Sequence, residues 1–244
     1  MRWREFLEYY VYVQKCGGCG EILPDARKSE AFCSSCQLRW MVAKTENCAQ
    51  CFRPVVECTC MPKGLSSAGA LCLRKLIFYR AERGEQPQNK IVYHLKRNAN
   101  RRMAHFLAEE LKSAAMGELA VLGKENLGED CVIVSVPRGR AARNRYGFDQ
   151  AELMARALGE RLQIPYLRVL RRRIGGKEQK KLSRDRRFRN VCHLFCLKNA
   201  DEVRGKCVLL FDDVVTTGAS MAACVTLLRK AGACAVICLC IAQD

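Results

Sequence analysis

The sequence is short of acidic residues and lacks any long apolar run. No stretch reaches the about eighteen consecutive apolar residues that a membrane-spanning helix needs, which argues against a membrane span. Residues 1–20 carry acids and aromatics and lack the small-residue cleavage site of a secretory signal. The 25 acidic residues face 42 lysines and arginines, so the formal charge is +17. This excess favours polyanionic partners: nucleic acid, phosphorylated metabolites or an anionic surface.

Histidine is scarce, with three residues, whereas cysteine is abundant, with 17. Eight cysteines lie between Cys16 and Cys60, and most of the others stand alone. Cys207, Cys234 and Cys238, like Cys240, lie in an apolar stretch, where a reduced thiol packs as a small hydrophobe. Pairs at one end and single buried thiols at the other indicate a reducing compartment and a metal site. We therefore expect a cytoplasmic protein.

The clustered cysteines have the spacing of zinc ligands. A C-x₂-C pair, thirteen residues and a second C-x₂-C pair form one set, and C-x₂-C followed by C-x-C forms another. The eight are Cys16, Cys19, Cys33, Cys36, Cys48, Cys51, Cys58 and Cys60. Two such pairs complete a tetrahedral Zn²⁺ shell. The C-x-C pair is less standard, so either two sites form, or one is complete and the other partial. Disulfides or a redox C-x-x-C are the alternatives.

No histidine stands among these positions, which leaves no open catalytic coordination site. A module of about 45 residues has too small a core to fold without help, so the zinc is expected to be structural. We predict a double zinc ribbon over residues 1–62, whose role is fold, docking or nucleic-acid contact. Residues 61–69 are rich in Gly, Pro and Ser and are predicted to be a linker. An α/β domain is predicted over residues 63–244.

The rest of the chain alternates apolar runs with helical periodicity. This pattern predicts a parallel sheet with helices on both faces. Strands are expected at 70–79, 131–136, 166–170, 207–211 and 233–242, and helices at 89–95, 100–115, 149–162 and 221–231.

Residues 206–220 hold the most informative pattern in the chain. A buried strand is followed by two adjacent acids, Asp212 and Asp213, and then by a loop of small residues before a helix. The loop residues are Thr216, Thr217, Gly218, Ala219 and Ser220. Such a loop suits a phosphate, because Gly218 lets the backbone approach and the first N–H groups of the helix point at the anion. The acids lie where ligands bind in open α/β sheets and suit sugar hydroxyls or Mg²⁺. The plainer alternative is a strand–turn–helix with solvated acids.

This stretch resembles the phosphoribosyl pyrophosphate (PRPP) motif of type I phosphoribosyltransferases. The resemblance implies that Asp212 and Asp213 contact the ribose hydroxyls and that the following loop wraps the 5′-phosphate. It also implies a pyrophosphate loop after the strand at 131–136. That loop consists of Ser135, Val136, Pro137 and Arg138. From sequence alone, the same residues form an ordinary turn.

Further residues resemble the narrower ComF family. They are Arg145, Gly147, Phe148 and Gln150, and, at the family's spacings, Gln179, Leu182, Ser183, Arg187, Asn190 and Phe195. Tyr146, Asp149 and the Cys58-x-Cys60 pair depart from the family pattern. The resemblance implies a mobile loop closing over PRPP, with Gln179, Lys180, Lys181 and Arg187 as its candidate contacts. The glycines at 175–176 are a hinge or simply a loop tip.

Two functions follow from the resemblance and the charge. One is Mg²⁺-dependent displacement of pyrophosphate from PRPP at the ribose anomeric carbon; its acceptor is unidentified, because no general base or base-binding hood is evident. The other is a protein without turnover that senses PRPP or handles single-stranded nucleic acid in DNA uptake, with the PRPP fold as a ligand sensor, as the competence role of ComF-type proteins implies. A basic run at 171–189 suits the second function, although such runs are often solvated loops.

Overall fold

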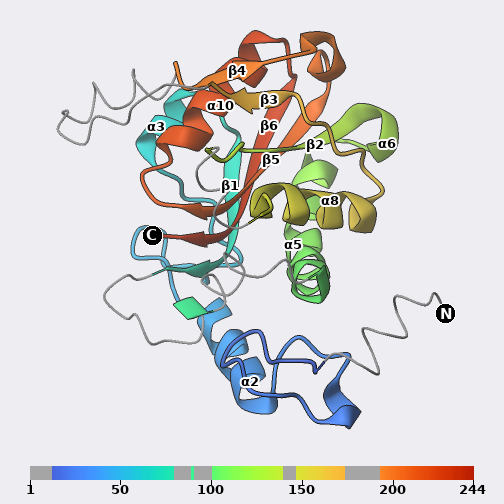
Figure 1. Cartoon of the computed structure of the whole chain (residues 1–244). Coiled ribbons are helices and arrows are strands. Elements are labelled where there is room, and N and C mark those ends of the chain that lie inside the picture. The colour runs from blue at the N-terminus through green and yellow to red at the C-terminus, as the bar shows by residue number, and fades with distance from the viewer. Residues whose placement is uncertain (1–12, 80–88, 91–100, 140–146, 174–192) are drawn as a thin grey trace.

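A computed structural model of the chain describes residues 13–79, 89–90, 101–139, 147–173 and 193–244. An α/β part holds the sheet, and a smaller cysteine-rich part containing α2 (Ser34–Lys44) lies below it in Figure 1. Among the described residues, no helix combines the length and apolar character needed to cross a bilayer.

Four parallel strands form the sheet, in the order β1-β6-β5-β2. The strands are β1 (Cys72–Phe78), β2 (Cys131–Ser135), β5 (Cys207–Val215) and β6 (Ala235–Gln243). The central strands are buried over most of their length, because both of their faces are covered by helices.

Helices cover both faces of the sheet, so the predicted fold class is confirmed. On one face, α5 (Arg101–Val121) packs beside α8 (Gln150–Leu162). On the other face lie α10 (Ala219–Lys230) and the short α3 (Lys63–Ser67). Because the side chains of a strand alternate between faces, β5 supplies residues to both cores.

The remaining elements are short. An antiparallel ribbon pairs β3 (Leu170–Arg172) with β4 (Phe195–Leu197). The others are the 3₁₀ helices η1 (Asp25–Arg27) and η3 (Ala200–Val203), and the one-turn helix α6 (Leu127–Asp130).

Several predicted bounds are wrong. The helix predicted at 100–115 continues to Val121, because its buried stripe runs on through Leu119. The strand predicted at 166–170 begins at Leu170 instead, and Tyr166 forms a single parallel bridge to Ile133. The helix predicted at 221–231 begins at Ala219. The strand expected from residue 233 begins at Ala235, which leaves Cys234 exposed outside it.

The predicted linker is partly helical rather than an open spacer. Residues 63–67 form α3, and its Leu65 is fully buried in the core shared with α10. Residues 89–90 are helical, whereas the remainder of the helix predicted at 89–95 lies outside the described residues.

The cysteine-rich part shares a core with the α/β part. Phe32 and Trp40 pack against Phe106 of α5, with ring centroids 5.2 and 6.2 Å away. The indole N–H of Trp40 donates to Glu110 at 3.0 Å. These contacts join the two parts, while the predicted division at residue 62 stays a prediction.

Candidate functional site

The acid pair lies inside β5 rather than after it. The predicted strand end at residue 211 is wrong, because β5 stays in register with β6 through Val215. Neighbouring residues of a strand point to opposite faces, so Asp212 and Asp213 have different surroundings. Asp213 is buried and Asp212 is partly exposed.

Asp213 is paired with Arg138, which comes from the loop after β2. The guanidinium of Arg138 forms a hydrogen-bonded ion pair with Oδ2 of Asp213. Both side chains are largely buried, where an unpaired charge would be costly. This long-range pair explains how a carboxylate is tolerated within a central strand.

Asp212 is held differently. Its Oδ1 accepts a hydrogen bond of 2.9 Å from the backbone N–H of Asp213. Desolvation at this only partly exposed position, and then the charge of Asp213, raise the pKa of Asp212 well above the ordinary aspartate value. An ionised Asp212 is therefore costly in the free protein, and a bound cation or hydroxyl donors would relieve that cost.

The predicted phosphate loop turns into α10 at Gly218. Gly218 is the N-cap of α10 with φ of 72°, a left-handed conformation that favours glycine. The hydroxyl of Thr217 accepts from the N–H of Ala219 at 3.5 Å. The loop therefore ends at the N-terminus of a helix of 12 residues, where unpaired N–H groups suit an anion.

One cavity of about 250 Å³ brings three of the predicted groups together. It is lined by Arg138 and its neighbours from the loop after β2, by Asp212 of β5 and by Ser220 of α10. The full lining is Val136, Pro137, Arg138, Gly139, Arg172, Phe195, Asp212 and Ser220. Residues far apart in the sequence thus meet at the carboxyl ends of β2 and β5, where ligands bind in this class of sheet.

Three lining residues were not among the predicted site residues: Gly139, which directly follows the predicted pyrophosphate loop, and Arg172 and Phe195. Arg172 of β3 and Phe195 of β4 reach the cavity from the antiparallel ribbon, with the guanidinium 5.6 Å from the ring centroid. Phe195 matched a family spacing and Arg172 belonged to a basic run. Neither signal placed them at this cavity, because their pairing depends on the ribbon.

Other predicted site residues lie elsewhere. Ser135 is buried, and its hydroxyl is 2.9 Å from that of Tyr166. Among the five residues of the phosphate loop, Ser220 is the one that lines the cavity. The candidate contacts of the mobile loop fall outside the described residues, as do the glycines at 175–176. They are Gln179, Lys180, Lys181 and Arg187.

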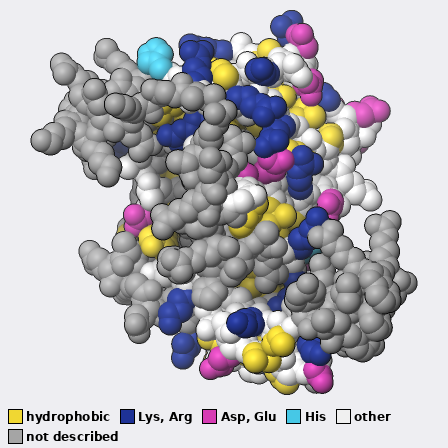
Figure 2. All heavy atoms as spheres, in the orientation of Figure 1, with side chains coloured by type: hydrophobic (Ala, Val, Ile, Leu, Met, Phe, Trp, Pro, Cys, Tyr) yellow, Lys and Arg dark blue, Asp and Glu magenta, His cyan; other side chains and the backbone are white. Residues whose placement is uncertain are grey.

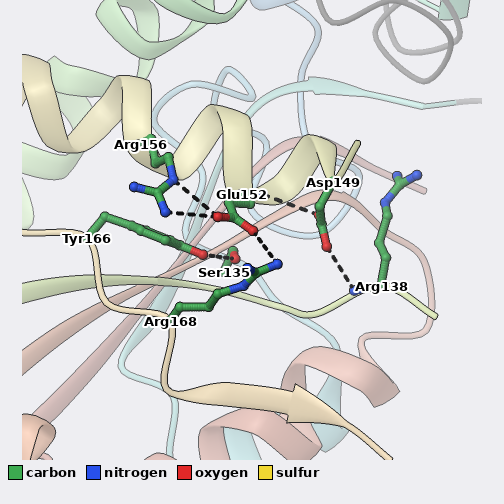
Figure 3. A network of polar contacts seen from close by, with 7 residues as sticks. All are labelled: Ser135, Arg138, Asp149, Glu152, Arg156, Tyr166 and Arg168. Carbon is green, nitrogen blue, oxygen red and sulfur yellow. Dashed lines mark hydrogen bonds and ion pairs between the residues drawn. The ribbon is translucent and has the colours of Figure 1, made fainter. Parts of the chain in front are cut away.

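A polar network anchors the loop after β2 to α8 (Figure 3). Asp149 caps α8 by accepting from the N–H of Glu152 at 3.4 Å, and its other oxygen accepts from the N–H of Arg138 at 3.3 Å. Glu152 pairs in turn with Arg156 and Arg168, each at 2.9 Å. Asp149 thus caps α8 and fixes the backbone that carries Arg138.

The eight clustered cysteines form two compact groups of thiols. The first cysteine group is Cys16, Cys19, Cys33 and Cys36, and the second cysteine group is Cys48, Cys51, Cys58 and Cys60. Within each group the four sulfurs lie within 4.8 Å of one another. The C-x-C pair is therefore as well placed as the other pairs. All eight are free thiols, so the disulfide alternative is not realised in this structure.

The surroundings of both groups fit zinc, which prefers four thiolates in a tetrahedron. The Sγ of Cys16 accepts from the N–H of Cys33 at 3.2 Å, and the Sγ of Cys48 accepts from the N–H of Gln50 at 3.4 Å. A Cβ on Gly18 would lie 2.8 Å from the Sγ of Cys36, so only glycine fits there.

One thiol of each group ionises readily. Desolvation acts to raise the pKa of Cys33, but hydrogen bonds from Ser35 and from the backbone of Cys36 outweigh it and lower the pKa to about 6. Desolvation likewise opposes the backbone hydrogen bonds that lower the pKa of Cys48 to about 6. Because thiolates are the metal ligands, a lowered thiol pKa in each group favours metal binding there.

Comparisons with known proteins agree with the α/β architecture. Residues 125–244 match the sequence family described as the phosphoribosyl transferase domain. The chain therefore contains a domain of the phosphoribosyltransferase type. No curated protein matched the chain.

Among solved structures, one match is a hypoxanthine phosphoribosyltransferase from Staphylococcus aureus, with 17% identity and a TM-score of 0.33. It covers 56% of this chain and 65% of that protein, so less than two thirds of that protein's length is represented.

Proposed function

We propose that this protein binds PRPP together with Mg²⁺ and displaces pyrophosphate from it, as a ComF-type phosphoribosyltransferase. The observation that carries the proposal is the single cavity shared by Arg138, Asp212 and Ser220, in a domain of the phosphoribosyltransferase type. In the proposed arrangement, the acid pair orients the ribose hydroxyls. The loop from Thr216 to Ser220 holds the 5′-phosphate, and the loop around Arg138 holds the pyrophosphate.

The proposed reaction breaks the bond between the ribose anomeric carbon and the pyrophosphate oxygen, and an acceptor forms the new bond. Mg²⁺, when bound, would neutralise charge on the leaving pyrophosphate. Arg138 supports this role, because it lines the cavity at the end of β2. Asp212 supports it as well, since its raised pKa would be relieved by a cation or by ribose hydroxyls.

Calorimetric titration with PRPP, with and without Mg²⁺, tests this proposal. We expect binding that requires Mg²⁺ and is lost in the double variant Asp212→Asn/Asp213→Asn. The matched control is Asp201→Asn/Glu202→Gln, which neutralises two exposed acids on η3 and should leave binding unchanged. Absence of PRPP binding to folded, zinc-loaded protein would overturn the proposal.

A second candidate function is the handling of single-stranded DNA. The formal charge of +17 favours it, and Lys and Arg side chains gather over the part of the surface where β3 and β4 lie (Figure 2). Arg171 and Arg173 are exposed there. This function predicts oligonucleotide binding that weakens steeply with salt, survives the double acid substitution and falls in Arg171→Ala/Arg173→Ala. Undetectable or salt-insensitive binding would exclude it.

We also infer a reducing compartment such as the cytoplasm. The inference is supported by the cysteines, since every one that the structure describes is a free thiol.

A further inference from the structure

The PRPP proposal gives no role to Lys75, a lysine that is 1% exposed within β1. A buried ammonium group needs compensation, because burial removes its hydration. Its Nζ donates to the backbone carbonyl of Cys60 at 2.6 Å. Cys60 belongs to the second cysteine group, so Lys75 ties the sheet directly to a candidate zinc site.

The charge of the second cysteine group explains this placement. Four thiolates around one Zn²⁺ carry an excess of negative charge, which a neighbouring cation stabilises. Arg74, the residue before Lys75, donates to the backbone carbonyl of Glu57 at 3.0 Å. Two adjacent cations of β1 therefore contact the short segment that contains Cys58 and Cys60.

The same segment is followed by Pro62, which lies next to the phosphate loop. Pro62 follows Cys60 by two residues, and a Cβ on Gly218 would lie 3.1 Å from the Cγ of Pro62. The chain then enters α3, whose fully buried Leu65 lies in the core that includes α10. A movement of Cys60 would therefore shift Pro62 and, through it, Gly218. Gly218 is the N-cap of α10 and belongs to the predicted phosphate loop.

Strand register places Lys75 on the site's side of the sheet. Lys75 on β1 pairs with Cys240 on β6, and Cys240 pairs with Asp212 on β5. Residues directly paired across parallel strands face the same side. Lys75 and Asp212 therefore share the face that α3 and α10 cover.

We propose that metal binding at the second cysteine group sets the position of the phosphate loop, with Lys75 as the positioning residue that ties this group to β1. The first cysteine group lacks this route among the described residues. It is joined instead to α5, where Arg102 donates to the backbone carbonyl of Lys15 at 2.9 Å. The effect on the phosphate loop rests on the proposed function, whereas the effect on metal retention does not.

The test uses the full zinc-loaded chain and the variant Lys75→Met, which removes the charge and keeps a side chain of similar length. We expect a folded protein that retains about one zinc ion fewer than wild type after dialysis against a chelator, since loss of an outer partner weakens zinc binding about 10- to 100-fold. The Kd for PRPP should rise about tenfold or more once that zinc is lost. Re-adding zinc in excess should restore the affinity.

Lys44→Met is the matched control. It removes one half-buried lysine that pairs with Glu110 of α5 instead of contacting the second cysteine group. Zinc content and PRPP affinity should both stay at the wild-type values. A second pair, Cys51→Ser against Cys19→Ser, removes one ligand from each group in turn, and PRPP affinity should fall in the first variant alone. If Lys75→Met does not fold, this pair of variants still tests whether the second cysteine group is coupled to the phosphate loop.

The possible outcomes distinguish the proposed role of the second cysteine group from the proposed PRPP function. Full zinc retention by Lys75→Met would overturn the role of Lys75. Zinc loss with unchanged PRPP affinity would overturn the coupling to the phosphate loop. If wild type itself fails to bind PRPP, the proposed function fails, and zinc retention still decides whether Lys75 supports the metal.

Discussion

Asp212 and Asp213 are adjacent in the chain, yet they have different partners in the folded protein. Asp213 has Arg138 as an ion-pair partner, whereas Asp212 accepts a backbone hydrogen bond and has a raised pKa. A group whose ionised form is disfavoured in the free protein costs stability that binding can return. The pair thus combines one acid held by an ion pair with one held by a backbone hydrogen bond.

Replacing Asp212 by asparagine should stabilise the free protein. Because burial and Asp213 raise the pKa of Asp212, the folded state disfavours its ionised form, and wild-type stability falls as pH rises above the unfolded value of about 4. Asp212→Asn should therefore increase the free energy of unfolding by about 1 kcal/mol at pH 8 and by less near pH 4. Urea unfolding at both pH values measures this. Asp201→Asn is the exposed control, and a destabilised Asp212→Asn would contradict the explanation.

At the level of single residues, the sequence was informative where a residue type in a given pattern has few structural roles. Gly218 before a helix and cysteines at C-x₂-C spacing point to a close backbone approach and to a metal site. The pairing of Arg138 with Asp213 was not predictable, because it joins the loop after β2 to the interior of β5, and only the folded sheet brings these together. Lys75 gave no signal either, since a lysine in an apolar strand usually marks an exposed edge.

At the scale of elements, the turn into α10 is the most constrained part of the proposed site. Gly218 combines a positive φ with close contact to Pro62, so a side chain there meets both backbone strain and crowding. Gly117 offers a contrast, because it is an exposed glycine within α5 and a Cβ there would meet nothing within 4 Å.

The two glycines should respond to alanine in opposite directions. Gly218→Ala should lower the free energy of unfolding by about 1–2 kcal/mol, the cost of a left-handed alanine, and should weaken PRPP binding. Gly117→Ala should raise the free energy of unfolding by about 0.5–1 kcal/mol, because alanine is the better helix former. Denaturant titration of both variants measures the difference. Equal effects at the two positions would refute the assigned strain.

The helices and strands differ in how well the local sequence predicts them. The buried strands and α8 were predictable from apolar runs and helical periodicity, since these are local patterns. The end of β5 was not, because adjacent acids normally mark a loop, and here Arg138 compensates one of them from a distance. The short α3 was hidden because glycine and serine suggest a linker, while Leu65 is held by packing against α10.

At the scale of the whole molecule, the cysteine-rich part and the α/β part are expected to unfold together. Their shared core contains Phe32, Trp40 and Phe106, and Lys75 joins the second cysteine group to β1. An interface this buried couples the stability of both parts.

Thermal unfolding followed by two probes tests this coupling. In a Trp3→Phe background Trp40 is the single tryptophan, so its fluorescence reports on the cysteine-rich part, while far-UV circular dichroism reports mainly on the sheet and its helices. We expect coincident transitions, and a common shift to lower temperature when zinc is chelated. Two separate transitions would instead support an independent module ending near residue 62.

The strand order also has a consequence for how the protein is made. β1 pairs with β6, and β6 lies between β1 and β5, although β1 is translated long before β6. On the ribosome, β1 must wait until β6 has been translated before its hydrogen-bonding partner exists, so the sheet closes late and such long-range pairing is slow. During that interval the cysteine-rich part, which emerges first and already packs beside β1, is the available cover for this strand. Zinc supply during translation would then affect the yield of folded protein before any ligand is bound.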